Sequence, residues 1–293
     1  MQNNEQGGTV IMRWPHYKHV FFDCDSTLTT VEGIDILAET VGKKWRVEVL
    51  TKAAMDGQLD LEDVYGKRLQ AVSATRAQIR NIRRIYKQNI VEDAREVIAA
   101  LQALEHNVYI ISGGLAEPVA EFGIFLGVPR TQIRAVQVDY NQLEGDWWQR
   151  ITEDQEAGSA RYLTFIEGDL TATNGKANVV KELLGEQSGR SLLIGDGNSD
   201  LRAGSAVDLF VGFGGVVSRP HVLEEAPAFI HSSSLAPLLV LAAGPAAYRL
   251  VKNTPHEAVF ARGIDMIQSG AITFTNGRLQ NKFHSALAKV IQP

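Results

Sequence analysis

The 293-residue sequence has a single cysteine, Cys24, and no apolar run that approaches the length needed to span a bilayer. One cysteine cannot form an intramolecular disulfide, so a reducing compartment is expected. The first eight residues are polar and contain glycine, without the basic and apolar regions of a signal peptide. These absences predict a cytoplasmic globular protein.

The sequence also lacks an excess of positive charge. Its 29 Lys and Arg residues stand against 34 Asp and Glu residues, for a formal net charge of -5, so no overall field attracts nucleic acid or a membrane surface. The seven histidines are scattered, which argues against a zinc site. One basic cluster is present, and a solvated helix face explains it better than a binding patch: Arg76, Arg80, Arg83, Arg84 and Lys87.

Among the features that are present, the segment from His19 to Thr30 stands out. The apolar run 20–22 has the composition of a buried strand and stops at two acids, Asp23 and Asp25. In an open α/β sheet, ligands bind in the crevice beyond the carboxyl ends of the strands. An isolated Asp-x-Asp pair more often caps a turn or a helix, so the later segments decide between capping and chemistry.

Three later segments place further functional groups at an expected strand end or helix start: Ser112-Gly113-Gly114, Lys176, and Asp196 with Asp200. Glycines at a strand-to-helix turn let backbone N–H groups approach an anion closely, and the helix N-terminus adds a favourable potential. Taken singly, these segments are also consistent with tight turns and an exposed lysine. Taken together and in this order, they describe a phosphate site.

The charges of such a site have a physical rationale. A carboxylate that attacks a phosphate dianion is repelled by roughly 4 kcal/mol per pair of unit charges at about 4 Å and an effective dielectric near 20. Lys176 would supply one compensating positive charge, and a Mg²⁺ ion on carboxylate oxygens would supply two more. Ser112 and nearby N–H groups could hold the remaining phosphate oxygens.

The hydrophobic pattern predicts an α/β fold with a Rossmann-like, doubly wound, mostly parallel sheet. Four helical segments follow the first strand, at about 34–41, 44–56, 60–72 and 76–88, and read as a cap over the carboxyl edge of the sheet. Later strands are expected at 108–111, 134–140, 192–194 and 209–211, the last of these closing the core. After residue 241 we expect a helix near 255–268, a strand at 272–274, a turn at Asn276-Gly277 and a final helix.

These expectations divide the chain into a tail, a core, an insert and an extension. The predicted tail is 1–15, the catalytic core is 16–30 with 90–241, the helical cap is 31–89, and the C-terminal extension is 242–293. The extension could pack on the core, form an oligomer contact or modify access to the cap. The segment 141–172, which includes Trp147 and Trp148, is long for a connection between two core elements.

The polar motifs carry a resemblance to a known family. They are Asp23-Cys24-Asp25-Ser26-Thr27, Ser112-Gly113-Gly114, Lys176 and Gly195-Asp196-Gly197-Asn198-Ser199-Asp200. In this order they resemble the phosphatases of the haloacid dehalogenase superfamily, and more closely the phosphoserine phosphatase family. The likeness covers about 16–241.

The resemblance implies roles for these residues. Asp23 would be the nucleophile that forms an aspartyl-phosphate, and Asp25 would be the general acid and base. The phosphate would be bound by Ser112, Gly113 and Lys176. Mg²⁺ would be held by Asp23, the backbone carbonyl of Asp25, and Asp196, with Asp200 and Ser199 in support.

The resemblance also implies a substrate. In the family, a glutamate faces the substrate ammonium and a cap arginine pairs with its carboxylate; Glu32 and Arg68 occupy those positions, and Met55 matches a pocket position. Arginine suits a carboxylate because its guanidinium binds both oxygens. Without the resemblance, Glu32 would read as the start of a helix and Arg68 as part of a solvated face. Leu61 stands where the family usually has an aromatic residue, and Ser199 replaces the usual Thr or Asn.

The sequence therefore predicts a Mg²⁺-dependent phosphomonoester hydrolase of serine biosynthesis that converts O-phosphoserine to serine and phosphate. One alternative keeps the chemistry and changes the substrate to another small phosphorylated metabolite. Another is a catalytically idle binding or regulatory protein on the same fold, against which the complete set of acids and Lys176 argues. No nucleic-acid or membrane partner is expected. The sequence does not indicate whether the protein is a monomer or an oligomer.

Overall fold

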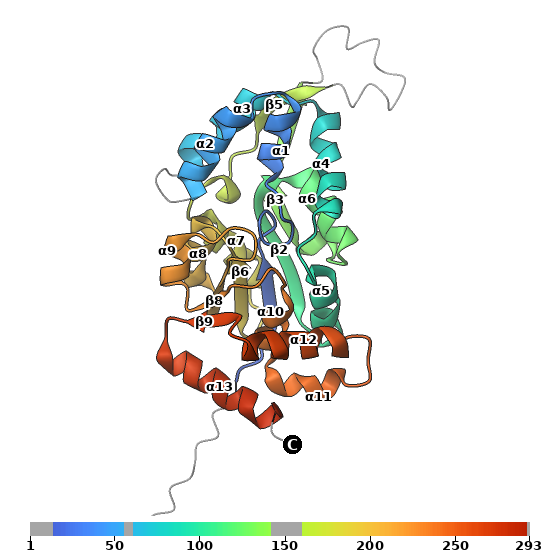
Figure 1. The fold of residues 1–293 in the computed structure, drawn as a ribbon. Helices are drawn as coiled ribbons and strands as arrows, with labels where there is room; N and C mark the ends of the chain where they lie inside the picture. The colour runs from blue at the N-terminus through green and yellow to red at the C-terminus, as the bar shows by residue number, and fades with distance from the viewer. Residues whose placement is uncertain (1–13, 56–60, 142–159, 292–293) are drawn as a thin grey trace, which may run out of the picture.

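The computed structural model describes residues 14–55, 61–141 and 160–291 (Figure 1). Its centre is a seven-stranded sheet with the strand order β3-β2-β1-β6-β7-β8-β9. Neighbouring strands from β3 to β8 are parallel, and β9 runs antiparallel to β8. The predicted fold class, a Rossmann-like and mostly parallel α/β sheet, is confirmed. The strands are β1 (His19–Phe22), β2 (Asn107–Leu115), β3 (Ile133–Val136), β6 (Ser191–Gly195), β7 (Leu209–Phe213), β8 (Ala228–Ile230) and β9 (Ile272–Phe274).

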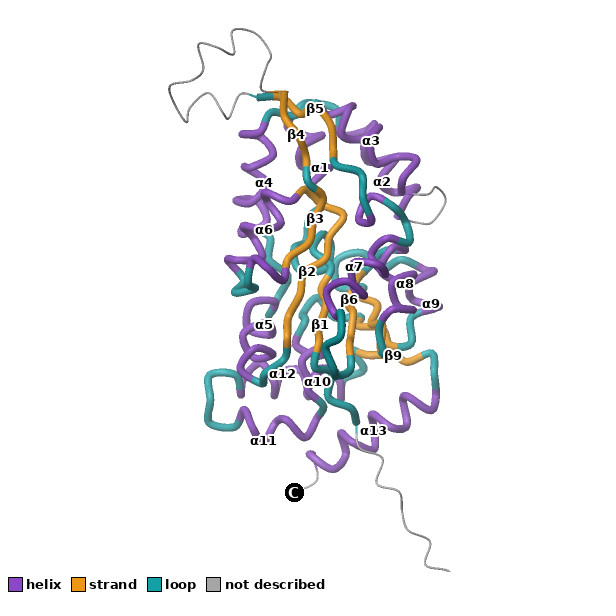
Figure 2. Tube along the Cα trace, turned by 180° about the vertical axis from the view of Figure 1, so that it is seen from behind, coloured by secondary structure: helices purple, strands orange, loops and turns teal. Residues whose placement is uncertain are grey.

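Helices cover both faces of this sheet (Figures 1 and 2). One face carries α5 (Ala94–Ala103), α6 (Ala116–Phe125) and α10 (Ala236–Ala243), and the other carries α7 (Gly175–Leu184) and α8 (Asn198–Ala203), with α9 (Pro220–Glu225) beside α8. Because both faces are covered, the central strands are predominantly apolar, and all four residues of β1 are buried. Short 3₁₀ helices lie at Arg130–Gln132, Asp169–Thr171, Gly204–Ala206 and Pro245–Ala247.

A layer of four helices lies beyond the carboxyl ends of the strands, in the upper part of Figure 1. It consists of α1 (Gly33–Thr40), α2 (Lys44–Met55), α3 (Leu61–Val72) and α4 (Arg76–Gln88), close to the segments expected from helical periodicity. The assignment of 31–89 as a separate cap domain stays a prediction. We refer to α1–α4 below as the helical layer.

A two-stranded antiparallel sheet, β4 (Val138–Asn141) and β5 (Arg161–Phe165), is attached to the helical layer. The Tyr162 N–H donates to Ala74 O, the Arg76 N–H donates to Ala160 O, each at 2.8 Å, and the Phe165 ring packs against Tyr65. The prediction of one strand at 134–140 is wrong, because β3 ends at Val136 and the chain leaves the main sheet to pair with β5. Trp147 and Trp148 lie outside the described residues.

The second strand also differs from the prediction. β2 does not stop at Ile111 but continues to Leu115, with an irregular register against β3 between Ile111 and Leu115. Ser112, Gly113 and Gly114 therefore lie within a distorted strand end rather than in a turn after it. Helix α6 then begins at Ala116.

The residues after 241 pack on the core. α12 (Glu257–Gln268) lies against α10, β9 extends the sheet beyond β8, and α13 (Gly277–Ile291) buries Phe283 beside Trp14. The short helix α11 (Tyr248–Val251) precedes α12. The expected helices and the strand are present, but 209–211 is not the last core strand, since β8 and β9 follow it. This extension occupies the end of the molecule opposite the helical layer (Figure 1).

No helix in the described part of the chain is long and apolar enough to cross a membrane.

Candidate active site

Asp23 directly follows the carboxyl end of β1 and lines a pocket between the sheet and the helical layer. Its backbone N–H donates to Ile194 O of the neighbouring strand, which fixes the position of the residue. Its carboxylate accepts a hydrogen bond from Lys176 Nζ at 2.5 Å, and the same ammonium donates to Asp200 Oδ1 at 2.6 Å. All three side chains are buried. The first and the last of the predicted polar segments therefore meet at one lysine.

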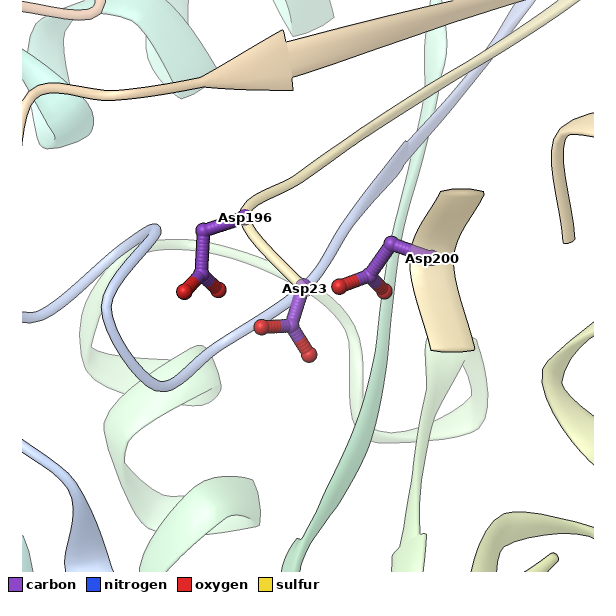
Figure 3. Close-up of side chains that lie close together, drawn as sticks. All are labelled: Asp23, Asp196 and Asp200. Atoms are coloured by element: carbon purple, nitrogen blue, oxygen red, sulfur yellow. The ribbon is translucent and has the colours of Figure 1, made fainter. Parts of the chain in front are cut away.

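Three carboxylates gather at this point (Figure 3). Ligand oxygens of Asp23, Asp196 and Asp200 all lie within 4.8 Å of one another, and all three residues are buried. Carboxylate oxygens are the donors preferred by hard divalent cations. The donor set fits such a cation, because three carboxylates this close together repel one another unless positive charge lies between them.

Protonation behaviour reflects the same crowding. Burial and the nearby Asp200 carboxylate raise the pKa of Asp23 to about 7, against the opposing effect of Lys176. Burial raises the pKa of Asp196 well above its usual range, although Arg219 opposes this shift. Burial lowers the pKa of Lys176, but Asp200 and Asp23 outweigh it, and the net direction is upward. Lys176 is therefore a permanent cation in this site.

Asp25 has different partners. The Tyr86 hydroxyl donates to Asp25 Oδ1 at 2.5 Å, and the Gly33 N–H donates to Oδ2 at 3.2 Å. Burial and the charge of Glu32 raise the pKa of this carboxyl well above its usual range. An upward shift of a carboxyl pKa favours the protonated form, which is the form that a general acid requires.

The segment 112–114 forms a second wall of the pocket. The Ser112 hydroxyl is buried and accepts a hydrogen bond from the Gly114 N–H at 2.9 Å. The Gly113 carbonyl accepts a hydrogen bond from the Tyr65 hydroxyl of α3 at 2.8 Å. This bond joins the helical layer to the strand end across the pocket.

Glu32 and Arg68 also line the pocket. Glu32 accepts a hydrogen bond from the Ser26 hydroxyl at 2.6 Å and lies 3.9 Å from Arg219 Nη2. Arg68 is only 5% exposed and donates to Thr51 Oγ1 at 3.2 Å, while its Nε has no hydrogen-bond partner among the described residues. A buried guanidinium with an unused donor is costly unless an acceptor is supplied.

The structure brings nearly all of the predicted residues into one cavity of about 80 Å³. The members of the predicted set that line it are Asp23, Asp25, Glu32, Arg68, Ser112, Gly113, Lys176, Asp196, Ser199 and Asp200. Met55 is the last residue of α2, and its side chain and that of Leu61 lie outside the described part of the structure. The roles of all these residues stay predictions.

Three residues at the site were not found from the sequence. Tyr65 and Tyr86 line the pocket, and Arg219 donates to Asp196 Oδ2 at 3.0 Å. Tyr86 shares helical spacing with Ile79 and Ile82 and so looks like an ordinary core residue. For Tyr65 a signal existed: it precedes Arg68 by three residues and must lie on the same face of the helix. For Arg219 we find no signal in the sequence.

Comparisons with known proteins agree with this geometry. Residues 20–205 match the family model of the haloacid dehalogenase-like hydrolases. A phosphoserine phosphatase of Drosophila melanogaster is 32% identical over 214 residues, which cover 72% of this chain and 73% of that protein. The human phosphoserine phosphatase is 30% identical over 213 residues, covering 72% of this chain and 88% of that protein.

A solved structure described as a phospho-aspartyl intermediate analogue of phosphoserine phosphatase shares the fold. It has a TM-score of 0.63 and 23% identity, and the match covers 76% of this chain and 98% of that one. The chain belongs to the haloacid dehalogenase-like hydrolase family. More particularly, it is a phosphoric monoester hydrolase similar to the phosphoserine phosphatases.

Proposed function

We propose that the protein is a Mg²⁺-dependent phosphomonoesterase that hydrolyses O-phosphoserine through an aspartyl-phosphate on Asp23. The observation that carries the proposal is the position of Asp23, whose carboxylate lines the pocket, accepts a hydrogen bond from Lys176 and belongs to the carboxylate cluster with Asp196. The names of the relatives support the choice of substrate.

In the first step a carboxylate oxygen of Asp23 forms a bond to phosphorus, and the bond between phosphorus and the serine oxygen breaks. Asp25 gives its proton to that serine oxygen, so serine leaves as a neutral hydroxyl. In the second step Asp25 takes a proton from water, the water oxygen bonds to phosphorus, and the bond to Asp23 breaks. Phosphate leaves and both carboxyls return to their initial states.

The remaining groups of the pocket hold the phosphoryl group. Lys176 offsets the charge of Asp23 as the phosphate approaches, and Ser112 with the N–H of Gly113 would bind its non-bridging oxygens. Asp23, Asp196 and the backbone carbonyl of Asp25 would hold the metal, with Asp200 and Ser199 in support. When bound, Mg²⁺ supplies positive charge that stabilises the additional negative charge of the transition state.

The two ends of a zwitterionic substrate match Glu32 and Arg68. Glu32 offers a carboxylate to an ammonium group, and the unused Arg68 Nε offers a buried donor to a carboxylate. We assign 31–89 as a cap over the core of 16–30 and 90–241, since the Tyr65 hydroxyl closes the pocket from the side of α3. A closed cap excludes water from the reacting phosphate.

A comparison of two phosphate esters tests the substrate assignment. With Mg²⁺ present, phosphoserine should be hydrolysed with a higher kcat/KM than phosphoethanolamine, which has the ammonium but lacks the carboxylate. Arg68→Lys should lower kcat/KM for phosphoserine about 10- to 100-fold, because a charge-assisted pair contributes about 1.5 to 3 kcal/mol. The same substitution should leave phosphoethanolamine hydrolysis nearly unchanged.

Arg84→Lys, on an exposed position of α4, is the matched control and should change neither substrate. Equal hydrolysis of both esters by the native protein, or an equal loss on both in Arg68→Lys, would exclude phosphoserine and retain a phosphatase of another small metabolite. Absence of phosphatase activity toward any ester would overturn the proposed function.

A further inference from the structure

Tyr86 lies in the last turn of α4 and is fully buried. Its hydroxyl donates to Asp25 Oδ1 at 2.5 Å, and its ring packs edge-on against Phe122 of α6 at 5.4 Å between centroids. The proposed chemistry above does not use this residue. Its contact nevertheless falls on the carboxyl group that has to move a proton twice in each catalytic cycle.

The two oxygens of Asp25 are held from different directions. Tyr86 binds Oδ1, and the Gly33 N–H binds Oδ2. A Cβ atom added to Gly33 would lie 2.3 Å from the Tyr86 hydroxyl oxygen, so the glycine leaves the space that this hydroxyl occupies. With both oxygens bonded, rotation of the carboxyl group about its terminal torsion is restricted.

Of these two oxygens, Oδ2 is on the side of the phosphate-binding segment. A Cβ atom added to Gly114 would lie 3.5 Å from Asp25 Oδ2 and 3.1 Å from Ser112 Oγ. Oδ2 therefore lies near the place proposed for the phosphoryl group and its leaving oxygen. Oδ1 accepts the hydrogen bond from the Tyr86 hydroxyl, whereas Oδ2 accepts the longer one from the Gly33 N–H and faces the pocket segment 112–114.

Two ion pairs join helix α4 to the core. Arg76 pairs with Glu117 at 2.8 Å and Arg83 with Glu121 at 2.5 Å, both on α6. Just beyond its C-terminus, the Thr29 hydroxyl donates to Asn89 O at 2.9 Å. Tyr86 therefore reaches from the helical layer to Asp25 of the core and is in a position to orient its carboxyl group.

We propose that Tyr86 is a positioning residue for catalysis: its hydroxyl fixes Oδ1 of Asp25 and so directs Oδ2 at the leaving oxygen and, later, at the attacking water. The inference rests on the proposed function, because it requires Asp25 to transfer protons. A purely structural role for the hydroxyl would stabilise the fold without affecting one chemical step more than another.

The leaving group separates these two roles. Serine needs a proton in order to leave, whereas acetate leaves from acetyl phosphate as an anion and needs none. Rapid-quench measurements of phosphoenzyme formation should show Tyr86→Phe slowing the reaction with phosphoserine by about 10-fold or more. The reaction with acetyl phosphate should stay within about 2-fold of native, because no proton transfer assists it.

The ratio of the two rates in one preparation does not depend on the fraction of protein that is folded, so a loss of stability in Tyr86→Phe does not affect the conclusion. Tyr109→Phe is the matched control: Tyr109 is a buried tyrosine in β2 whose hydroxyl lies 3.4 Å from His19 Nδ1, away from the pocket. The ratio of the phosphoserine rate to the acetyl phosphate rate in Tyr109→Phe should equal that of the native protein.

A double substitution completes the test. If Tyr86 acts through Asp25, adding Tyr86→Phe to Asp25→Asn should change the phosphoserine rate by less than about 2-fold. Equal slowing of both substrates by Tyr86→Phe, no slowing of either, or a full further loss in the Asp25→Asn background would each overturn the inference. Failure of the proposed function is a different result, since the native protein itself would then form no phosphoenzyme.

Discussion

At the scale of single residues, the site contains several acids whose ionised form is disfavoured by burial. The pKa of Asp23 is raised to about 7 by burial and by Asp200, and burial raises the pKa values of Asp25 and Asp196 well above their usual range. For Asp25 this shift serves the proposed acid role. For Asp23 and Asp196 it is a cost that a bound cation would offset, because positive charge favours the ionised form.

This cost predicts an unusual dependence of stability on pH. Between the ordinary carboxyl pKa and the raised value, the folded protein binds protons that the unfolded chain has released, so the free energy of unfolding must fall as pH rises through that window. The metal-free protein should therefore have a lower Tm at about pH 8 than at about pH 5.5. Added Mg²⁺ competes with these protons and should raise Tm more at the higher pH.

Thermal unfolding with EDTA or with Mg²⁺ at both pH values checks this prediction. Asp196→Asn should remove most of the Mg²⁺-dependent increase, while Asp265→Asn, at an exposed position of α12, should retain it. A metal-free protein that gains stability toward pH 8, or a Mg²⁺ effect of equal size at both pH values, would contradict the account of these acids.

At the scale of elements, the contact between α12 and α10 shows how the C-terminal extension is fixed. A Cβ atom on Gly263 would lie 2.4 Å from the Ala236 carbonyl oxygen and 2.9 Å from Val240 Cγ2. The absence of a side chain at Gly263 therefore sets the close approach of the two helices. Arg262, next to it, pairs with Asp93 at the start of α5 at 2.8 Å.

Gly263→Ala should accordingly destabilise the protein. The added methyl group meets backbone atoms of α10 that cannot move aside easily, and overpacking of this kind costs about 1 to 3 kcal/mol. Gly277→Ala is the matched control, because nothing lies within 4 Å of a Cβ at that position, and its effect should stay within about 0.5 kcal/mol. Denaturant unfolding measures both, and equal stabilities of the two variants would contradict the packing described here.

At the scale of the whole molecule, the candidate active site and the C-terminal extension lie at opposite ends of the central strands. The pocket lies at the carboxyl ends, between the sheet and the helical layer, and the extension packs at the opposite end (Figure 1). Within the described residues, no residue after 241 lines the pocket. Folded Gly263→Ala protein should for this reason keep its native kcat.

Features that depend on a local pattern of residues could be predicted from the sequence, whereas features that depend on contacts between distant segments could not. Asp23 and Asp196 could be placed together in advance, because the carboxyl ends of parallel strands meet at one edge and each acid follows an apolar strand. Lys176 opens a helix, from whose N-terminus its ammonium could reach the same crevice. The helical spacing of apolar residues predicted the four helices of the helical layer in the same local way.

Other features have no local signal. The segment 134–140 reads as one strand, and only the pairing of its second part with β5, twenty or more residues later, divides it between two sheets. β8 is only three residues long, too short for a periodic pattern. The contact of Tyr86 with Asp25 joins residues 61 positions apart, so it depends on how α4 packs and not on spacing in the sequence.

The most direct test of the central claim is to identify the residue that carries the phosphoryl group. The protein is mixed with phosphoserine and Mg²⁺, quenched rapidly in acid, and its peptides are analysed by mass spectrometry. We predict a phosphoryl group on Asp23 in the native protein, and neither this modification nor turnover in Asp23→Asn. A phosphoryl group on another residue, or turnover by Asp23→Asn at the native rate, would contradict the account.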